Sequence, residues 1–410
     1  MREVVVVDAI RSPIGKSGWG GKKQGMLSET SAQDLLAQIL RSLTDRVKEK
    51  AGGFEEGMIE EVLVGCLTQI GEQGANIARI ASLIAGLPNE VSGSTVNRYC
   101  NAGLSAINWA AQSIMTNAGD IMIAAGVELM SHYGMGDDVT VAMNAGKKVV
   151  FSDRFGETGM TTPQGLSAEF VADKYGLTRD AMDRFGLWSN QKAVQAQRDG
   201  RLEGRVVHVV GKDTDGNEVR ITKDETPRAA CLDDPDGALA KMGTLPSRFK
   251  EEGMVTAGNS SQIVDGAAAV MLMEKNKAKE LGLKPLTTIR SFGNAGGDPQ
   301  LMLLAPIPAA EKALARAGKG IGDMDVIEPN EAFASPCLAF ARHFEYADDD
   351  PRVNPSGGAI ALGHPIGASG VIYFTEMCHE LNARDGRWGL QLVCGGGGIG
   401  IATVVEREDY

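Results

Sequence analysis

The chain has 410 residues and a net charge of −12, with 43% hydrophobic and 23% charged residues. This length and balance are typical of a globular protein with room for two or more domains. The acidic balance excludes the electrostatic pattern of a nucleic-acid-binding protein, and an anionic substrate would need a local basic site. No apolar run reaches the roughly 18 residues of a membrane span, so we expect no membrane partner.

The cysteines form no CxxC pair and show no metal-ligand spacing. They are Cys66, Cys100, Cys231, Cys337, Cys378 and Cys394. The first residues also lack the pattern of a signal peptide. We therefore expect free thiols in a reducing, cytoplasmic environment, without a disulfide framework.

Strands and helices alternate in the first third of the chain. Apolar runs predict strands at residues 3–9, 60–66, 94–97 and 120–126, and helical spacing predicts helices at residues 31–43, 76–87 and 100–115. The run EVVVVDA is typical of a strand that is buried on both faces. This alternation predicts an α/β fold with a mostly parallel sheet, covered on both faces.

The composition changes between residues 131 and 254, where glycine, methionine and charged residues dominate. Two amphipathic helices are predicted there, at residues 167–174 and 179–199, and a hairpin over residues 206–222 that turns at Asp215-Gly216. A long insertion in an α/β domain usually carries function or covers a site.

The order of elements then repeats. A strand at residues 265–273 completes the first series of strands and helices. Elements that match members of this series then follow at residues 287–292, 308–317, 325–327, 353–354 and 390–393. We therefore predict two similar α/β halves, residues 1–130 with 255–284 and residues 285–410, separated by an inserted domain at 131–254. A site between such halves would lie at the carboxyl ends of their strands.

Cys100 follows a predicted strand and begins a small-residue helix, VNRYCNAGLSA. A thiol at a helix N-terminus is expected to have a lowered pKa, which suits a nucleophile. A lone cysteine is more often a buried core residue. Other segments must decide between these interpretations.

Three glycine-framed segments lie downstream. His364 stands in GGAIALGHPIGASG, where it fits a base toward a cysteine, and Cys394 enters four glycines whose N–H groups can approach an oxyanion. Each has an ordinary alternative: a loop histidine, a small buried cysteine, and for Asn330 in NEAFA a helix cap. Their equivalent placement in two half-repeats favours one common site.

The segments VNRYCNAGLSA, TAGNSSQIVDGAAA, NEAFA, GGAIALGHPIGASG and CGGGGIG resemble the thiolase family of acetyl-CoA acyltransferases, in order and spacing, over essentially the whole chain. The resemblance implies two similar βαβαβαββ halves packed in layers, with a loop domain inserted in the first half against coenzyme A (CoA). It also implies CoA thioesters as substrates, no metal or redox cofactor, and a homodimer or homotetramer.

The resemblance assigns roles to the catalytic residues. Cys100 accepts the acyl group as a thioester, and His364 takes its proton. His364 and a water held by Asn330 form the oxyanion hole for the CoA thioester, while Cys394 is the acid and base at the α-carbon. The N–H groups of Cys100 and Gly396 resemble a second oxyanion hole, and the kinetics should be ping-pong.

The substrate contacts carried over from the family are Arg228 in DETPR, against the adenine of CoA, Ser261, against the pantetheine arm, and Phe333 in NEAFA. The match at the first two is weaker than at the catalytic residues. Arg228 fits a solvated loop charge equally well.

Four departures from the family pattern bear on the substrate. They are Asn101-Ala102-Gly103 after the cysteine, Gln164-Gly165, residues 302–306 and residues 126–131. They favour a longer or bulkier 3-oxoacyl chain, fatty or steroid-derived, over acetoacetyl-CoA. The first hypothesis is thus a degradative 3-ketoacyl-CoA thiolase. The alternatives are a biosynthetic acetyl-CoA C-acetyltransferase and a non-catalytic acyl-CoA carrier. A ketoacyl synthase would have histidine in place of Cys394.

Overall fold

Strands and helices alternate along both ends of the chain in the structure, a computed structural model that describes residues 2–18, 22–147, 152, 154–160, 162–212 and 216–408. The strands are β1 (Val4–Arg11), β2 (Gly15–Gly18), β3 (Lys22–Lys23), β4 (Glu61–Gly65), β5 (Ser92–Val96), β6 (Ile121–Leu129), β7 (Val209–Lys212), β8 (Glu218–Ile221), β9 (Val264–Glu274), β10 (Thr287–Gly296), β11 (Val326–Pro329), β12 (Trp388–Gly395) and β13 (Ile399–Glu406). The α-helices are α1 (Ala32–Lys50), α2 (Ile77–Ile84), α3 (Ala102–Met115), α4 (Asp137–Asn144), α5 (Gln164–Tyr175), α6 (Arg179–Arg198), α7 (Ala230–Asp233), α8 (Pro235–Gly243), α9 (Lys275–Glu280), α10 (Pro306–Ala317), α11 (Ala334–Phe344) and α12 (Ile366–Ala383).

The main sheet is mixed, with the order β11-β12-β13-β10-β1-β9-β6-β4-β5. β4 runs parallel to β5 and β6, and β11 runs parallel to β12. β9 and β13 run antiparallel to both of their neighbours. The prediction of a mostly parallel sheet is therefore wrong. β13 follows β12 through a tight glycine turn, and β9 follows the insertion, so neither strand enters by the crossover helix that a parallel neighbour requires.

The two halves of the sheet repeat the same plan. In the first half the order is β5-β4-β6-β9-β1, and in the second β11-β12-β13-β10. Val353 forms a parallel bridge with Ile327 of β11, in the place that β5 takes beside β4. A short antiparallel pairing of β1 with β10, at Val5↔Thr288 and Val6↔Thr287, joins the halves. The predicted pair of similar α/β halves is confirmed.

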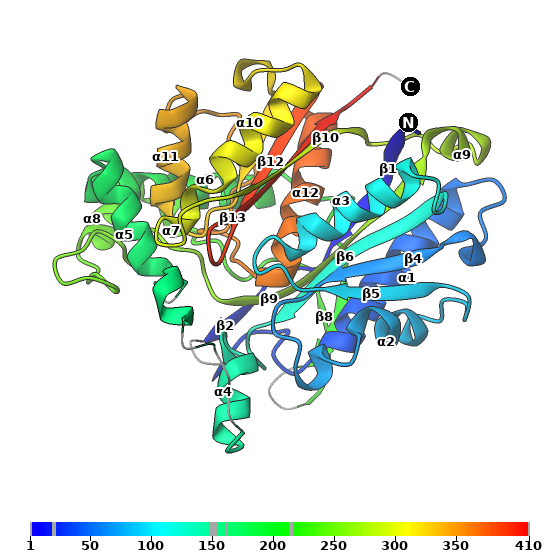
Figure 1. The fold of residues 1–410 in the computed structure, drawn as a ribbon, viewed down its shortest axis with the longest axis horizontal. Helices are drawn as coiled ribbons and strands as arrows, with labels where there is room; N and C mark the ends of the chain where they lie inside the picture. The colour runs from blue at the N-terminus through cyan, green and yellow to red at the C-terminus, as the bar shows by residue number, and fades with distance from the viewer. Residues whose placement is uncertain are drawn as a thin grey trace.

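Helices cover both faces of each half-sheet. α3 and α12 pack against each other and against the strands of both halves, and cross the centre of the molecule (Figure 1). α1 packs against α2 and β9, and α10 packs against β10 and β13. β1 shows the two-sided burial directly, because Val4 and Val6 join the core cluster of α3 and α12 while Val5 and Val7 join that of α1 and α2.

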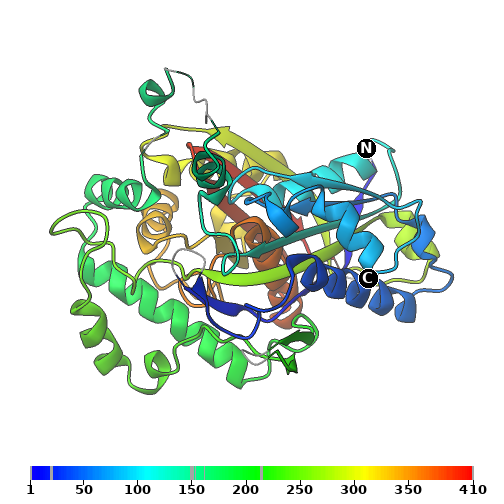
Figure 2. The same ribbon diagram turned by 90° about the horizontal axis from the view of Figure 1, so that it is seen from below.

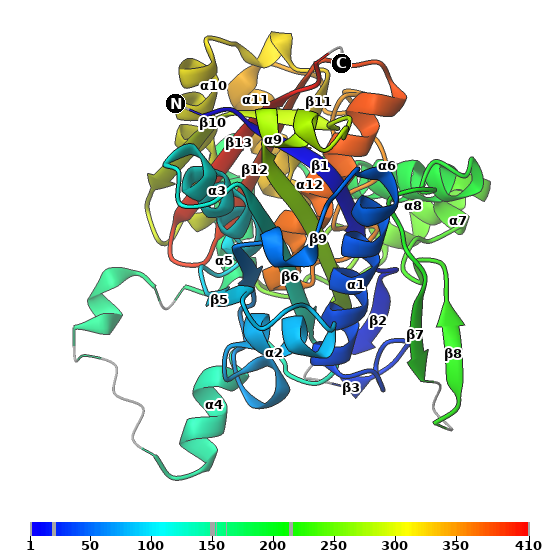
Figure 3. The ribbon, with the colours of Figure 1, turned by 90° about the vertical axis from the view of Figure 1, so that its right-hand side faces the viewer.

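The insertion gathers to one side of this core. Figure 2 shows its helices grouped away from both chain ends, and α5 and α6 pack against α11. α4 stands away from the body of the molecule in Figure 3. The predicted helices correspond to α5 and α6, and the predicted hairpin to β7 paired with β8. Of its predicted turn, Asp215 lies outside the described residues.

Candidate active site

Cys100 lies in the short turn between β5 and α3. Tyr99, directly before it, has a left-handed φ of 50°, and an isolated bridge pairs Arg98 with Cys100. The side chain of Cys100 is buried, with 3% exposure. The structure therefore places Cys100 at the strand-to-helix turn that the sequence predicts.

The environment of Cys100 keeps its thiol protonated. Burial raises the pKa of the thiol, and the nearby Cys394 and Glu128 raise it further. The backbone N–H groups of Cys100 and Gly396, which hydrogen-bond to the sulfur, offset part of this rise. The expected lowering of the pKa by the helix is wrong, because the loss of hydration outweighs the helix dipole. A neutral thiol needs a base before it can attack a carbonyl.

His364 precedes α12 and has the properties of such a base. Its Nδ1 lies 2.5 Å from the hydroxyl oxygen of Ser369, and that hydroxyl donates to the carbonyl of Pro365 at 3.0 Å. Because the hydroxyl proton is used there, Nδ1 must be the protonated nitrogen. Nε2 has no hydrogen-bond partner within the described residues. Burial lowers the pKa of His364 to about 4, so the ring is neutral with a free lone pair.

Glycines bring the helices of Cys100 and His364 into backbone contact. A Cβ on Gly103, in the first turn of α3, would lie 2.8 Å from the carbonyl oxygen of Gly367 in the first turn of α12. A Cβ on Gly65, at the end of β4, would lie 2.5 Å from the nitrogen of Gly103 and 2.6 Å from the same carbonyl. Side chains at Gly65 and Gly103 would push the two helix starts apart.

Asn330 directly follows β11, and Cys394 is the second-last residue of the neighbouring parallel strand β12. The Asn330 amide Nδ2 donates to Cys394 Sγ at 3.8 Å, and Asn330 Oδ1 has no partner among the described residues. Burial raises the pKa of Cys394 to about 11, even though the Asn330 hydrogen bond lowers it. This second thiol is therefore also neutral near pH 7.

The glycine turn after Cys394 holds the N–H group of Gly396 next to Cys100. Gly397 and Gly398 have left-handed φ values of 75° and 80°, which glycine adopts without strain. Gly398 is anchored to the end of the β10 segment, because its carbonyl accepts a hydrogen bond from Gly297 N–H at 2.7 Å. The N–H groups of Cys100 and Gly396 thus form a pair of donors around one sulfur.

The predicted substrate contacts fall into two groups. Ser261 N–H donates to the carbonyl of Ala332 at 3.0 Å, next to Phe333, and Phe333 shares an apolar cluster with Cys394. Phe249, which the sequence analysis did not single out, packs edge-to-face on Phe333 at 6.0 Å. Arg228, the third predicted contact, approaches Ala257, four residues before Ser261.

Arg228 is half-buried on the segment between β8 and α7. Its backbone N–H donates to Asn190 Oδ1 at 3.1 Å, and its guanidinium lies 3.5 Å from the carbonyl of Ala257. Burial lowers the pKa of this guanidinium. No carboxylate in the described ranges pairs with it, so its charge is open to an anionic or aromatic ligand.

Two family models cover almost the whole chain. The thiolase N-terminal domain matches residues 4–276, and the thiolase C-terminal domain matches residues 283–407. The chain belongs to the thiolase family. It is an acyltransferase with thiolase activity.

Several relatives match this thiolase along its full length. It is 41% identical over 409 residues to a 3-ketoacyl-CoA thiolase of Idiomarina loihiensis, covering 99% of this chain and 100% of the relative. It is 40% identical to the 3-oxoadipyl-CoA/3-oxo-5,6-dehydrosuberyl-CoA thiolase of Escherichia coli, with the same coverage. The crystal structure of the Bacillus anthracis acetyl-CoA acetyltransferase matches with a TM-score of 0.86 and 34% identity, covering 100% and 99% of the two chains. The predicted thiolase fold is confirmed.

Two buried carboxylates of this thiolase, Glu128 and Glu331, hold backbone and side-chain donors around the site, and neither was predicted from the sequence. Glu128 accepts hydrogen bonds from the N–H groups of Leu67, Thr68 and Gly367 at 2.8–3.0 Å. Glu331 accepts from Ser189 Oγ, Asn354 Nδ2 and Ile360 N–H at 2.6–3.0 Å. For Glu128, an acidic residue near the end of an otherwise apolar strand is the signal that could have found it.

The described part of this thiolase contains no cluster of three or more histidine, cysteine, aspartate or glutamate side chains suited to a metal ion. Among the helices described, none has the length and apolar character needed to cross a membrane.

Proposed function

We propose that this thiolase cleaves 3-oxoacyl-CoA by thiolysis, with Cys100 as nucleophile and Cys394 as acid and base. The observation that carries the proposal is the pair of buried thiols. Cys394 lies close enough to raise the pKa of Cys100, and it holds the Asn330 amide at 3.8 Å. Cleavage of a carbon–carbon bond beside a ketone requires a nucleophile at the ketone and a proton donor for the departing enolate. Two neutral thiols supply both.

In the first half-reaction, Nε2 of His364 accepts the thiol proton while the Cys100 sulfur attacks the 3-carbonyl carbon. The negative oxygen accepts hydrogen bonds from the N–H groups of Cys100 and Gly396. Such a pair of donors is worth roughly 100- to 1,000-fold in rate for each donor. Collapse breaks the bond between carbons 2 and 3, which leaves the acyl group on Cys100 and the electron pair on the acetyl-CoA enolate.

Protonation of the enolate completes this half. The enolate oxygen accepts from the protonated His364 and from a water held by Asn330, whose Oδ1 is free within the described structure. Cys394 donates its proton to carbon 2, and acetyl-CoA leaves. The Cys394 thiolate then takes the proton of an incoming CoA thiol, which attacks the thioester. His364 returns its proton to Cys100 as the shortened acyl-CoA forms, so the kinetics are ping-pong.

For the acyl chain, we propose a group longer or bulkier than acetoacetyl, from fatty-acid or steroid side-chain degradation. The names of the relatives, 3-ketoacyl-CoA thiolase and 3-oxoadipyl-CoA/3-oxo-5,6-dehydrosuberyl-CoA thiolase, support a degradative role. The apolar cluster that joins Cys394, Met302, Leu303 and Phe333 supports an apolar chain.

The biosynthetic direction, in which two acetyl-CoA molecules condense to acetoacetyl-CoA, is the second candidate. The 34%-identical acetyl-CoA acetyltransferase structure favours it. The dependence of kcat/KM on acyl-chain length separates the two, because a biosynthetic enzyme should prefer the acetoacetyl substrate.

We also propose that the inserted segment, residues 131–254, forms the CoA-binding domain between a first half at 1–130 with 255–284 and a second half at 285–410. Arg228 would contact the adenine, and Ser261 and Phe333 the pantetheine arm. The guanidinium of Arg228, which pairs with no carboxylate in the described ranges, supports its assignment. CoA would serve as a substrate, with no further cofactor.

The assembly that we propose is a homodimer or homotetramer. β5 ends the sheet order, so one of its backbone edges is unpaired within the described structure, and an edge strand of this kind readily pairs with another chain. We place the enzyme in the cytoplasm, because thiolysis needs both Cys100 and Cys394 in the reduced state.

The test is a thiolysis assay on a series of 3-oxoacyl-CoA substrates, which follows the loss of enolate absorbance after CoA is added. We expect turnover that varies with chain length. A folded protein that cleaves no chain length would contradict the proposal and favour a non-catalytic acyl-CoA carrier.

A further inference from the structure

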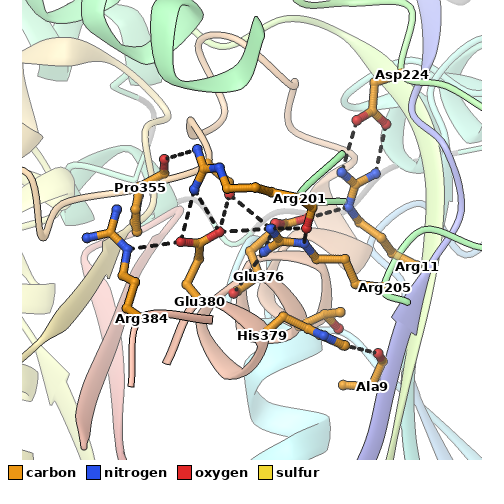
Figure 4. Close-up of polar contacts among 12 residues, drawn as sticks. Ala9, Arg11, Arg201, Arg205, Asp224, Pro355, Glu376, His379, Glu380 and Arg384 are labelled. Atoms are coloured by element: carbon orange, nitrogen blue, oxygen red, sulfur yellow. Dashed lines mark hydrogen bonds and ion pairs between the residues drawn. The ribbon is translucent and has the colours of Figure 1, made fainter. Parts of the chain in front are cut away.

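The last residue of β1 is an arginine, Arg11, that the proposed chemistry does not use. The guanidinium of Arg11 is fully buried, and it donates to both carboxylate oxygens of Asp224 at 2.7 and 2.9 Å. Its Nε donates to Glu376 of α12 at 2.6 Å. Figure 4 shows Arg11 between these two carboxylates.

Arg11 belongs to a larger buried network. Arg205 reaches Glu376 and Glu380 at 2.8 Å each, and Arg201 and Arg384 also bind Glu380 (Figure 4). Buried ion pairs of this kind contribute little net stability relative to apolar packing, because desolvation opposes the attraction.

Asp224 begins a segment, residues 224–228, that we call the strap. Thr226 Oγ1 donates to the carbonyl of Leu362 at 2.8 Å, two residues before His364. The strap also meets Gln262, whose amide donates to the carbonyls of Thr226 and Ala361 at 3.3 and 2.7 Å. The carbonyl of Gln262 in turn accepts the N–H of His364 at 3.0 Å.

The contact of Arg11 with Glu376 holds the helix that follows His364. Glu376 lies on α12, the helix that begins at Ile366, directly after His364 and Pro365. One guanidinium thus binds both the strap, which fixes the backbone before His364, and the helix that follows it. The same strap ends at Arg228, whose N–H is fixed by Asn190.

We propose that the strap, clamped by Arg11, positions His364 and Arg228 together, and that Thr226 is the positioning residue of the strap. This inference rests on the proposed function, in which His364 is the base and Arg228 contacts CoA. A base must be held within a fraction of an ångström of its productive place, and a shift of about 1 Å lowers the rate by roughly 100-fold. The hydrogen bond from the Thr226 hydroxyl to the carbonyl of Leu362 directly links the strap, which ends at Arg228, to the backbone before His364.

The test compares Thr226→Val with Thr375→Val. Both threonines are buried and donate one hydrogen bond to a backbone carbonyl, but Thr375 binds Val371 within α12, away from the strap. For Thr226→Val we expect an approximately tenfold slower acetylation of Cys100 and an approximately fivefold higher KM for CoA. Thr375→Val should leave both values within about twofold of wild type, at a similar melting temperature. Thr226→Ser, which keeps the hydroxyl, should restore both.

A second pair tests the clamp. Asp224→Asn loses the charge that binds Arg11, and Glu380→Gln loses a charge of the same network that does not bind the strap. Asp224→Asn should slow the acetylation of Cys100 and raise the KM for CoA, as Thr226→Val does. Glu380→Gln should lower the melting temperature and leave both kinetic values unchanged. If Thr226→Val matches Thr375→Val while the wild type acetylates Cys100, the positioning inference is overturned. A wild type that forms no thioester at Cys100 would instead overturn the proposed function.

Discussion

The two halves of the molecule share one strand plan but carry different chemistry at the ends of their strands. In the first half, β5 leads within a few residues to Cys100 and α3. In the second half, the equivalent position at Val353 leads through a glycine-rich loop to His364 and α12. The repeated core thus places the proposed nucleophile and the proposed base before two helices that touch at Gly103 and Gly367.

The strands β6 and β12, which hold equivalent places in the two half-sheets, diverge in the same way. Glu128, the second-last residue of β6, accepts hydrogen bonds from backbone N–H groups, and the chain then continues into the insertion. Cys394, the second-last residue of β12, is followed at once by a glycine turn. The comparison teaches that packing preserves the strand plan, whereas the residues just beyond the strands decide what each half contributes.

The largest effect should follow removal of the proposed nucleophile, Cys100, from the first half. Cys100→Ser should lower thiolysis at least about 10,000-fold, because the hydroxyl is a far weaker nucleophile in a buried site. The measurement is steady-state thiolysis at saturating CoA. Cys378→Ala removes another buried thiol, on α12, and should remain active. Normal activity of Cys100→Ser would refute its role.

Removal of the thiol of the second half should separate the two half-reactions. Cys394→Ala should lower condensation of acetyl-CoA about 1,000-fold, because the proton transfer at carbon 2 loses its acid and base. Exchange of the α-hydrogen of acetyl-CoA with solvent measures this step, and it should be lost as well. An unchanged exchange rate would exclude Cys394 as the base.

A smaller effect is expected from the partner of the base. Ser369→Ala removes the oxygen that holds Nδ1–H of His364, and should lower kcat roughly 10- to 100-fold. Ser82→Ala is the matched control, since Ser82 is a buried helical serine that donates to the carbonyl of Ala78. The pH–rate profile of Ser369→Ala should also shift relative to that of the control. Equal rates for the two variants would contradict the tautomer assigned here.

The smallest kinetic effect is expected at Glu328, a buried residue of β11. Neither carboxyl oxygen has a hydrogen-bond partner within the described structure, and burial and neighbouring carboxylates raise its pKa well above 4.5. The folded state therefore favours the protonated acid. The contribution of the protonated Glu328 to the free energy of unfolding is complete below the pKa of the unfolded state and is lost as the pH rises toward the pKa of the folded state. Glu328→Gln should keep activity within about twofold. It should gain stability over wild type as the pH rises from 5 to 8, measured by urea denaturation; a difference that does not vary with pH would contradict this account.

Much of the fold was predictable because its strands are continuous apolar runs. The prediction at residues 120–126 corresponds to β6, and that at 265–273 to β9. Their relative direction was not predictable, because the pairing of β9 with β6 and β1 depends on how the insertion returns to the sheet. Local patterns do not contain that information.

The candidate site was likewise predictable only in part. Cys100, His364, Asn330 and Cys394 were found through their glycine-rich surroundings and the family resemblance. The direction of the Cys100 pKa was not predictable, because it depends on burial and on Cys394, nearly 300 residues away in the sequence. Ser369, Glu128 and the strap act through contacts that only the folded chain creates.

The most direct test of the division of labour between the two thiols is to locate the acyl group. The wild type and Cys394→Ala are incubated with acetyl-CoA, digested, and analysed by peptide mass spectrometry. We predict an acetyl group on the peptide that contains Cys100 in both proteins, and none on the peptide that contains Cys394 in the wild type. An acetyl group on Cys394, or its loss from Cys100 in Cys394→Ala, would contradict the account.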